Sequence, residues 1–445
     1  MSETTGRPKS VRSLVPARMD RLPWTRFHWM IVFGLGVSWI LDGLEIQIIA
    51  SNGFQESLGM DSAQVGLAGT IYLVGSALAG LSPNMEFLFA MRFIAGLGIG
   101  GEYAAINSAI DELVPARVRG RVALAINGSF WVGAALGAGL SLVLLDPAVL
   151  GPVWGWRAGF ALGALLAVAI LLVRRDVPES PRWLIAHGRA DEAEAVVARI
   201  EAEVEAQHGP LTPVTERLAY VQRAAPSLRQ VADVLLHRYR RRSVVALALM
   251  VSQAFFYNAI FFTYALVLTR FHGVPAGRVA LYIFPFALGN VLGPLLLGPL
   301  FDRVGRRKMI AVTYVLSGVG LELTGVAFML GWLDALTQAL CWSAVFFMAS
   351  AAASSAYLTV SEVFPLEMRA LAISLFYAVG TGAGGFAAPF LFGLLIDTGS
   401  RGAVSVGYAI GAVLVIAAGL IALRWGVDAE RRSLEDISPP MGTGR

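Results

Sequence analysis

Residues 111–121 have the sequence DELVPARVRGR, and residues 361–370 have the related sequence SEVFPLEMRA. In each copy an acidic residue ends a long apolar run, a proline follows, and an arginine precedes the next apolar run. Matching residues are 250 positions apart: Glu112 and Glu362, Pro115 and Pro365, Arg119 and Arg369. A charged connection that occurs twice between apolar helices predicts two related halves, an organisation typical of membrane transporters.

The composition also predicts a membrane protein. Hydrophobic residues make up 56% of the 445 residues and charged residues 15%, whereas a soluble globular chain carries about 25% charged residues. The net charge of +4 is small, and no basic stripe with interleaved aromatic residues is present, so nucleic acid is not an expected partner. The single Cys341 excludes a disulfide within the chain.

Apolar runs long enough to cross a bilayer as helices recur along the chain. They predict an all-α membrane protein of two pseudo-symmetric helical bundles, with about 11 transmembrane helices. The expected spans are 29–50, 64–81, 86–110, 121–145 and 157–174 in the first half, and 243–268, 279–300, 309–330, 336–360, 371–396 and 404–426 in the second.

Polar segments divide the chain into five expected parts. These are a basic cytoplasmic tail (1–28), a first bundle (29–175), a central cytoplasmic loop (176–242), a second bundle (243–427) and a C-terminal tail (428–445). In the central loop, apolar residues from Ala193 to Val204 recur at helical spacing and predict an amphipathic surface helix. The tail from Val427 is polar, and we expect it to be disordered.

The first half is about 36 residues shorter than the second between its first span and the acidic residue of the repeated motif. Arginines before Trp29 and at 117–121 should both face the cytoplasm, which requires an even number of crossings between them. Three spans are expected there, so either one apolar run between 64 and 110 does not cross, or a helix and loop are missing. We favour a deletion from a twelve-helix parent.

Three further motifs resemble those of the major facilitator superfamily, nearest its sugar-porter and metabolite:proton symporter branches. The stretch PESPRWL at 178–184 matches that branch's motif in full. The loop GPLFDRVGRRK at 298–308 is similar to the family's G-x-L-x-D-R-x-G-R-R/K, and RFIAGLGIG at 92–100 to its R-x-x-x-G-x-G-x-G. The resemblance covers residues 29–426 and implies a multi-pass protein of the cell membrane that transports a small solute. We expect it to work as a monomer.

Charged residues near the helix ends are expected to hold one arrangement of the two bundles and to separate in the other. An acid at a helix end can accept charge-assisted hydrogen bonds from arginine or cap a neighbouring helix N-terminus. Such contacts suit alternating access, although the same charges could serve only to set membrane topology. The candidates are Glu112, Arg119, Glu179, Arg182, Asp302, Arg303, Gly305, Arg306, Arg307, Glu362 and Arg369.

Two acids inside the first span are candidates for proton coupling. Asp42 and Glu45 are three residues apart and project from nearly one helix face, and carboxylates at membrane depth are functional candidates. The resemblance adds that GLE at 43–45 stands where proton-coupled sugar porters carry Gly-Tyr-Asp, and that Arg92 corresponds to the arginine that pairs with that acid. Glu102 is a third candidate. Alternatively, Asp42 lies at the outer interface and Glu45 is a static partner of Arg92. Apart from the proton, no cofactor is expected.

Polar and aromatic residues that face a central cavity at mid-depth are the substrate candidates. They are Asn127, Trp131, Gln253, Tyr257, Asn258 and Tyr357. Gln253 and Asn258 belong to a stretch that resembles the sugar porters' Q-Q-x-x-G-x-N-A-I-F-Y, but Ser252 and Phe256 replace its first glutamine and its glycine. Tyr357 likewise replaces a family tryptophan. The solute is therefore left open between a sugar or related metabolite and an organic or aromatic acid.

No Walker loop, nucleophile triad or zinc pattern occurs, so neither an enzyme nor an ATP-driven pump is expected. The sequence predicts a secondary transporter driven by a gradient, and the intramembrane acids favour protons as the coupling ion. A non-transporting remnant or sensor of the same fold is the remaining alternative, because the first half is short.

Overall fold

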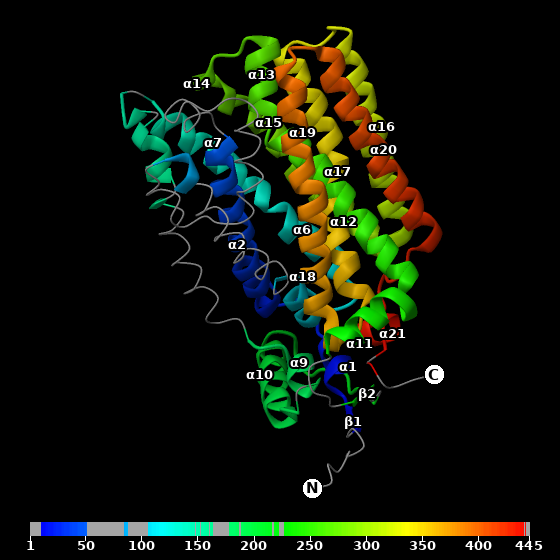
Figure 1. The fold of residues 1–445 in the computed structure, drawn as a ribbon. Helices are drawn as coiled ribbons and strands as arrows, with labels where there is room; N and C mark the ends of the chain where they lie inside the picture. The colour runs from blue at the N-terminus through cyan, green and yellow to red at the C-terminus, as the bar shows by residue number, and fades with distance from the viewer. Residues whose placement is uncertain are drawn as a thin grey trace.

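The computed structural model describes residues 10–50, 84–87, 106–162 except 147, 152 and 160, 178–215 except 187, 218–221, 227–439 and 441. In Figure 1 the helices of the first half stand on one side and those of the second half on the other. The first-half helices are α2 (Arg26–Ala50), α6 (Arg119–Gly128) and α7 (Phe130–Leu144).

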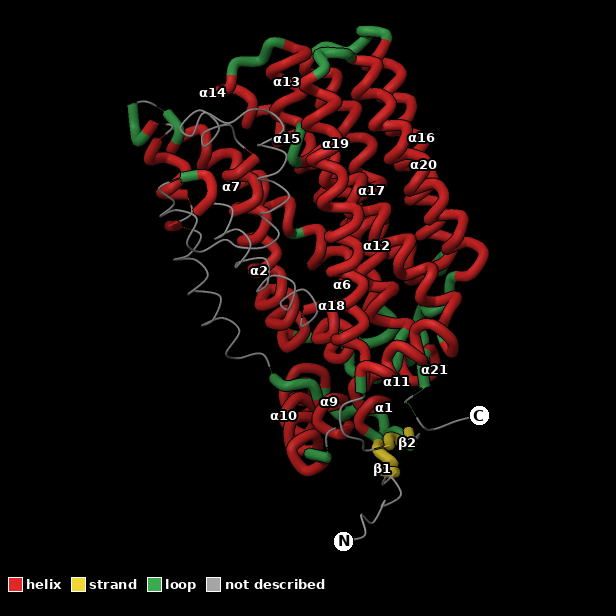
Figure 2. The backbone as a smooth tube through the Cα atoms, viewed as in Figure 1, coloured by secondary structure: helices red, strands yellow, loops and turns green. Residues whose placement is uncertain are grey.

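All six spans that the sequence predicts in the second half are helical. Its elements are α12 (Arg240–Phe261), α13 (Tyr264–His272), α14 (Ala276–Val279), a 3-10 turn (Ala280–Tyr282), α15 (Ile283–Arg303), α16 (Arg306–Met329), α17 (Ala335–Val363), a 3-10 turn (Leu366–Met368), α18 (Arg369–Gly380), a π-helical turn (Thr381–Gly385), α19 (Phe386–Asp397) and α20 (Arg401–Trp425). Figure 2 shows that most of the described chain is helical, with short loops between the helices.

Among the described residues, eight helical stretches are long and apolar enough to cross a membrane. They are Arg26–Leu44, Arg119–Leu144, Arg240–Phe261, Ala276–Arg303, Arg306–Met329, Ala335–Val363, Leu366–Asp397 and Arg401–Trp425. The expected spans 64–81, 86–110 and 157–174 lie wholly or largely outside the described residues, and so does the expected deletion. The all-α, multi-pass fold is confirmed, whereas the count of eleven stays a prediction.

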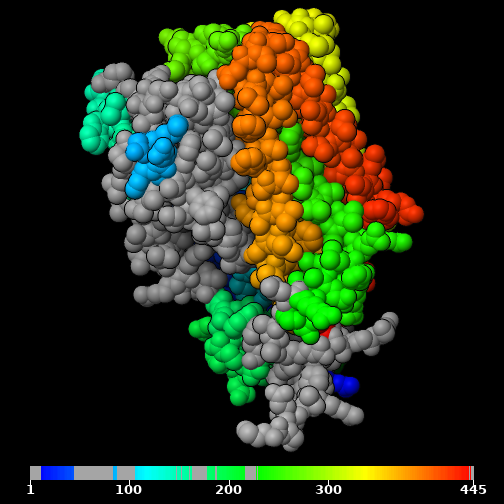
Figure 3. Space-filling model, viewed as in Figure 1, coloured from blue at the N-terminus to red at the C-terminus, as the bar shows by residue number. Residues whose placement is uncertain are grey.

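The outward surface of these helices is apolar, as a bilayer requires. Leu296 on α15, Leu323 on α16 and Val413 on α20 are 61%, 65% and 65% exposed. In water such large exposed apolar side chains would be costly, but in lipid they are the preferred surface. Figure 3 shows α18 and α19, drawn in orange, running along one face of the molecule.

Glycines let helices approach closely at matching places in the two halves. A Cβ atom on Gly133 of α7 would lie 1.6 Å from the backbone oxygen of Ile40 on α2. In the second half, a Cβ atom on Gly384 would lie 2.2 Å from the backbone oxygen of Val251 on α12. Only glycine permits such backbone contact, which fixes α2 against α7 and α12 against the π-helical turn. The two halves are therefore related in packing as well as in sequence.

Three helices are interrupted near their middles. Helices α6 and α7 meet at Ser129, whose hydroxyl donates hydrogen bonds to the backbone oxygens of Ile126 (2.6 Å) and Gly36 (3.1 Å). Helices α12 and α13 are separated by residues 262–263, and α18 and α19 by the π-helical turn. Such interruptions place irregular backbone and re-aimed side chains inside the bundle, where transporters bind their solutes.

Both described ends of the chain and the central loop lie together at one end of the bundles, which we call the tail face (Figure 1). There β1 (Ser10–Ser13) pairs antiparallel with β2 (Leu218–Val221), a small sheet that the sequence pattern did not reveal. The other elements of the tail face are α1 (Val15–Asp20), α9 (Pro181–Ala186), α10 (Ala190–His208), α11 (Leu228–Asp233), a π-helical turn (Val234–Arg238) and α21 (Leu434–Ile437).

Two expectations about these polar segments have different outcomes. The amphipathic helix of the central loop is present as α10, and Ala193, Val197 and Val204 are fully buried. The expectation of a disordered C-terminal tail is wrong. Leu434 and Ile437 of α21 are 1% and 2% exposed, because one helical turn places both apolar side chains against the bundle. The domain boundaries themselves stay predictions.

Candidate functional site

Asp302 links the two halves at the tail face. This residue, near the end of α15, accepts hydrogen bonds from the backbone N–H groups of Gly120 (3.0 Å) and Arg121 (2.9 Å) at the start of α6. Val118, the N-cap residue of α6, makes no side-chain cap, so a carboxylate from the other half satisfies these N–H groups. A Cβ atom on Gly120 would lie 2.6 Å from Asp302 Oδ1, so any larger residue at this position would clash with the carboxylate.

Arg306 joins two acids of the second half. Its Nε and Nη2 donate to Glu362 at 3.0 Å and 3.1 Å, and its Nη1 donates to Asp302 Oδ1 at 2.9 Å. The three residues are between 1% and 4% exposed. A buried charge needs this degree of pairing, and the planar guanidinium supplies it through a bidentate contact. Arg306 therefore holds Asp302 in position against α6.

The two copies of the repeated motif exchange partners across the molecule. Arg119 Nη1 of the first copy lies 3.7 Å from Glu362 Oε1 of the second. Arg369 Nη1 of the second copy lies 3.7 Å from Glu112 Oε1 of the first. At these distances the contacts are ion pairs rather than hydrogen bonds. We call Glu112, Arg119, Asp302, Arg306, Glu362 and Arg369 the charge cluster.

The remaining charged candidates lie around the charge cluster and not in it. Arg303 is exposed, Arg307 Nε lies 3.2 Å from Asp428 Oδ1 at the surface, and exposed Glu179 pairs with Arg189 at 3.3 Å. Gly305 has φ of +115°, a backbone conformation that favours glycine, and it leads into α16. The contacts described for these four positions do not join the two halves, and their role in gating stays a prediction.

Arg182 is fully buried and ties the tail segments to one another. It donates to Asp20 Oδ2 at 2.8 Å, and its Nε lies 3.5 Å from Glu435 Oε1. Asp20 also accepts from the backbone N–H of Ala116 at 3.2 Å and lies 3.6 Å from Arg119 Nη2. Arg182 thus connects the N-terminal segment, the central loop and the C-terminal tail next to the charge cluster.

A cavity of about 120 Å³ lies deeper between the halves. All six substrate candidates line it, although their role in binding stays a prediction. The described residues around it are Trp39, Asn127, Phe130, Trp131, Gln253, Ala254, Tyr257, Asn258, Phe261, Phe262, Ser350, Ala353, Ser354, Tyr357, Tyr377 and Thr381. Several of them flank the helix interruptions at Ser129, 262–263 and 381–385, which explains how they turn inward.

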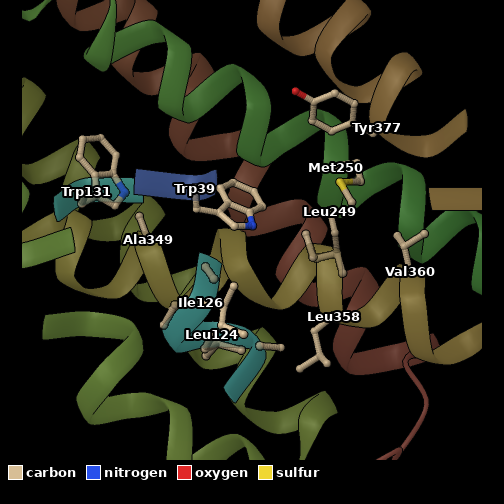
Figure 4. Close-up of a cluster of buried hydrophobic side chains, with 14 of the residues drawn as sticks. Trp39, Leu124, Ile126, Trp131, Leu249, Met250, Ala349, Leu358, Val360 and Tyr377 are labelled. Atoms are coloured by element: carbon tan, nitrogen blue, oxygen red, sulfur yellow. The ribbon is translucent and has the colours of Figure 1, made fainter. Parts of the chain in front are cut away.

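Aromatic rings form a connected wall of this cavity. Trp131 packs edge-to-face on Phe261 at 4.9 Å between ring centroids, and Trp39 does so on Tyr357 at 5.7 Å. Figure 4 shows Trp39 and Trp131 of the first half in one buried cluster with Tyr377 of the second. Edge-to-face contacts fix the orientation of each ring. The wall is therefore built before any solute arrives.

The polar groups of the cavity are largely engaged within the protein. The Tyr257 hydroxyl donates to Asn290 Oδ1 at 2.9 Å, and Asn258 Nδ2 donates to the backbone oxygen of Ala254 at 2.6 Å. Asn127 Nδ2 donates to Asn107 Oδ1 at 3.3 Å, whereas Asn127 Oδ1 has no hydrogen-bond partner within the described part of the chain. That buried amide oxygen is an acceptor available to a solute.

Of the proton-coupling candidates, only the Asp42 side chain is described. It is 9% exposed, and its charge acts on the hydroxyls of Tyr357 and Tyr377, two residues of the cavity wall. Glu45 belongs to α2, but its side chain lies outside the described part of the chain. Arg92 and Glu102 also lie outside it.

Sequence reasoning missed several residues that the structure brings to these sites. Asp20 braces Arg119 and Arg182 but sits in a polar tail without any motif. Trp39, Phe130 and Tyr377 line the cavity, yet an aromatic residue in an apolar run gives no sign of whether it faces lipid or the interior. Among the described residues, no cluster of His, Cys, Asp and Glu could hold a metal ion.

Residues 64–439 match the family model described as "Sugar (and other) transporter". The niacin transporter NiaP of Acinetobacter baylyi is 26% identical over 412 residues, covering 84% of this chain and 89% of that protein. The putative metabolite transport protein YdjK of Escherichia coli is 28% identical over 472 residues, covering 95% of this chain and 96% of that protein.

Solved structures agree on the fold. The proton:xylose symporter XylE, bound to 6-bromo-6-deoxy-D-glucose, superposes with a TM-score of 0.65 at 19% identity, covering 95% of this chain and 93% of that chain. A double-tryptophan mutant of XylE superposes with a TM-score of 0.69 at 18% identity, covering 93% and 98%. With its matched length, its helical spans and this fold, the chain belongs to the sugar (and other) transporter family of the major facilitator superfamily, and it is a multi-pass protein of the cell membrane.

Proposed function

We propose that this protein is a secondary active transporter that moves a small organic solute by alternating access, coupled to protons. The observation that carries the proposal is the position of the cavity between the halves. Trp39, Asn127 and Trp131 come from the first half, whereas Gln253, Asn258 and Tyr357 come from the second. A site shared by two bundles changes its exposure when the bundles rock.

The charge cluster supports this mechanism at the tail face. Its links between the halves are the two N–H bonds to Asp302 and the two crossed ion pairs. Tyr357 and Glu362 lie on the same helix, and five residues of helix span about 7.5 Å, so the cluster lies roughly one and a half turns from the cavity. In this arrangement the cluster closes the tail face, and it must separate for solute to pass.

Proton coupling is assigned to acids of α2. Asp42 is a buried acid whose charge acts on Tyr357 of the cavity wall, and Glu45 lies three residues further along the same helix. A carboxylic acid there can take a proton while the site faces one side and release it on the other. XylE, which shares this fold, is a proton:xylose symporter, and this supports the assignment. The proton is the proposed coupling ion, and no other cofactor enters the proposal.

The test is uptake by purified protein in proteoliposomes, with and without an inward proton gradient, repeated with Asp42→Asn and Glu45→Gln. We expect uptake that the gradient increases and that at least one of the two substitutions makes insensitive to it. Asp397→Asn, an exposed acid at the end of α19, is the matched control and should leave the response unchanged. Uptake indifferent to the gradient in the unaltered protein would contradict the proton assignment.

An organic or aromatic acid is a second candidate solute. The relative NiaP is described as a niacin transporter, and niacin is an aromatic acid. Competition between hexoses and carboxylates for uptake separates this candidate from a sugar. A non-transporting remnant or sensor is the third candidate, and it predicts binding without accumulation in the same vesicles.

A further inference from the structure

We infer that the central cavity is selective for a single flat aromatic ring with one polar substituent, and that it discriminates against monosaccharides. The inference rests on the proposed function in taking this cavity as the solute site. It goes beyond that function by naming the chemistry of the solute.

The cavity has about the size of one ring. Its volume is about 120 Å³. For comparison, an engineered apolar cavity of about 150 Å³ in another protein binds benzene. A disaccharide or a fused polycyclic solute would require the walls to move apart. Size alone admits both a monosaccharide and a single aromatic ring, so the lining has to decide between them.

The shape of the lining favours a flat ring. Half of the 16 described lining residues are aromatic. Trp131 is held by edge-to-face contacts with Phe261 and Phe286, at 4.9 Å and 5.1 Å between centroids, so its ring cannot turn aside. On α17, the small side chains of Ser350, Ala353 and Ser354 leave space beside these rings. Fixed aromatic faces next to small side chains form a slot that a planar ring fills with little loss of conformational entropy.

The hydrogen bonds of the lining argue against a sugar. A monosaccharide carries several hydroxyls, and each buried hydroxyl without a partner is costly. The hydroxyls of Tyr257 and Thr381 donate to Asn290 (2.9 Å) and to the backbone oxygen of Tyr377 (2.6 Å). The Tyr357 hydroxyl is engaged by Gln253. Several donors of the described wall are therefore used within the protein, which leaves fewer of them to donate to a ring of hydroxyls.

One acceptor of the wall suits a polar substituent. Asn127 Oδ1 is buried and has no hydrogen-bond partner among the described residues, in a side chain that is 5% exposed and lines the cavity. It can accept one hydrogen bond from an amide or protonated acid group on the ring. No Lys, Arg, Asp or Glu belongs to the described part of the lining, so the ring substituent is expected to enter in its neutral form.

The test combines binding and transport, so that failure of the inference can be told from failure of the proposed function. Binding is measured by quenching of intrinsic tryptophan fluorescence in detergent, and transport by counterflow in proteoliposomes. The probes are benzamide, nicotinamide and nicotinate in one arm, and D-xylose and D-glucose in the other. We expect the neutral amides to bind at least tenfold more tightly than either sugar and to exchange at least tenfold faster.

Ring variants test the wall. Trp131→Phe keeps a ring and should retain the preference, whereas Trp131→Leu should weaken amide binding about tenfold or more. Trp332→Leu is the matched control, because Trp332 is 74% exposed at the opposite end of the bundles. If Trp131→Leu does not fold, Tyr357→Phe against Tyr357→Leu makes the same comparison.

Each outcome decides a specific point. Sugars that bind or exchange as well as the amides overturn the inference and leave transport intact. Nicotinate preferred over both amides overturns the expectation of a neutral substituent. Saturable amide binding without exchange of any probe supports the inference and contradicts the transport function. Equal effects of Trp131→Leu and Trp332→Leu would show that the ring wall does not select the solute.

Discussion

At the residue scale, the carboxylate of Asp302 in the second half caps the N-terminus of α6 in the first half. Helix N-termini carry unsatisfied N–H groups and a partial positive charge, and α6 has no cap of its own. The bonds from Gly120 and Arg121 to Asp302 satisfy two of these groups only while the halves are together. Opening the tail face therefore exposes both the N–H groups and the carboxylate to water.

The prediction for this residue concerns amide exchange. Asp302→Asn should accelerate hydrogen exchange at Gly120 and Arg121, because the amide replaces one acceptor oxygen by a donor. A hydrogen bond to a charged group contributes about 1.5–3 kcal/mol, which corresponds to roughly 10- to 100-fold in exchange. Mass spectrometry of peptides from residues 119–128 measures it, and Asp397→Asn is the control. Unchanged exchange would mean that Asp302 does not hold the tail face closed.

The sequence predicted some residues of the site better than others. Asp302, Glu362 and Arg369 could be identified because a motif or a repeat marked them. Asp20 could not, because it gains its role only when the N-terminal segment folds under α6 and α9. Trp39 and Tyr377 could not be told from lipid-facing aromatics, since helical period does not reveal which neighbour covers a face. Tertiary contacts decide these cases.

At the scale of elements, α1 and α10 form a brace beneath the charge cluster. Arg18 and Arg21 of the N-terminal segment pair with Glu201 of α10, and Asp20 between them contacts Arg119 and Arg182. Burial alone would raise the pKa of Glu201, but the hydrogen bonds from Arg18 and Arg21 outweigh it and lower this pKa. Docking of α1 on α10 is therefore linked to the ionised carboxylate.

The linkage predicts a pH dependence. Because the pKa of Glu201 is lowered by docking, the stabilisation is present above the ordinary glutamate pKa and is lost as the pH falls through the lowered value. Spin labels at Val11 and Ala206, in a Cys341→Ser background, should give one narrow distance at neutral pH and a broad distribution in acid. Glu201→Gln should broaden the distribution of label distances even at neutral pH, whereas Glu203→Gln, at an exposed position, should not. A narrow distribution in both the acidic sample and Glu201→Gln would contradict the brace.

Elements were predicted well where one physical signal dominated. Six apolar runs of the second half were sufficient to place its helices, because length and apolarity decide a membrane span. The break at Ser129 and the π-helical turn at 381–385 carry no comparable signal, since helix–helix contacts and not local sequence select them. The buried α21 was missed because a single helical turn is too short to show a period.

For the whole molecule, the repeat explains why the charge cluster is crossed. Two copies of one motif, each with an acid and an arginine, meet at the boundary of two related halves. Glu112 then faces Arg369, and Arg119 faces Glu362. A pseudo-two-fold arrangement gives both pairs nearly the same geometry, and the identical distances of 3.7 Å agree with it. One motif therefore supplies both sides of the closure.

Charge reversal tests this arrangement. Arg369→Glu places a second acid beside Glu112, and an uncompensated buried charge costs about 3–5 kcal/mol, so uptake should fall by at least about a hundredfold. Adding Glu112→Arg should restore uptake about tenfold or more, because the pair is re-formed in reverse. Proteoliposome uptake measures both, and Arg303→Glu, an exposed neighbour, is the control. A double variant no better than Arg369→Glu alone would contradict the pairing.

On the proposed mechanism the tail face has to open, and residues 10–20 and 427–439 both lie there, so a bulky fusion near either end would hinder that motion. A fluorescent protein joined there would slow the motion it is meant to report. The turn at Gly331 and Trp332 is exposed at the opposite end, where an inserted tag would leave that motion unhindered.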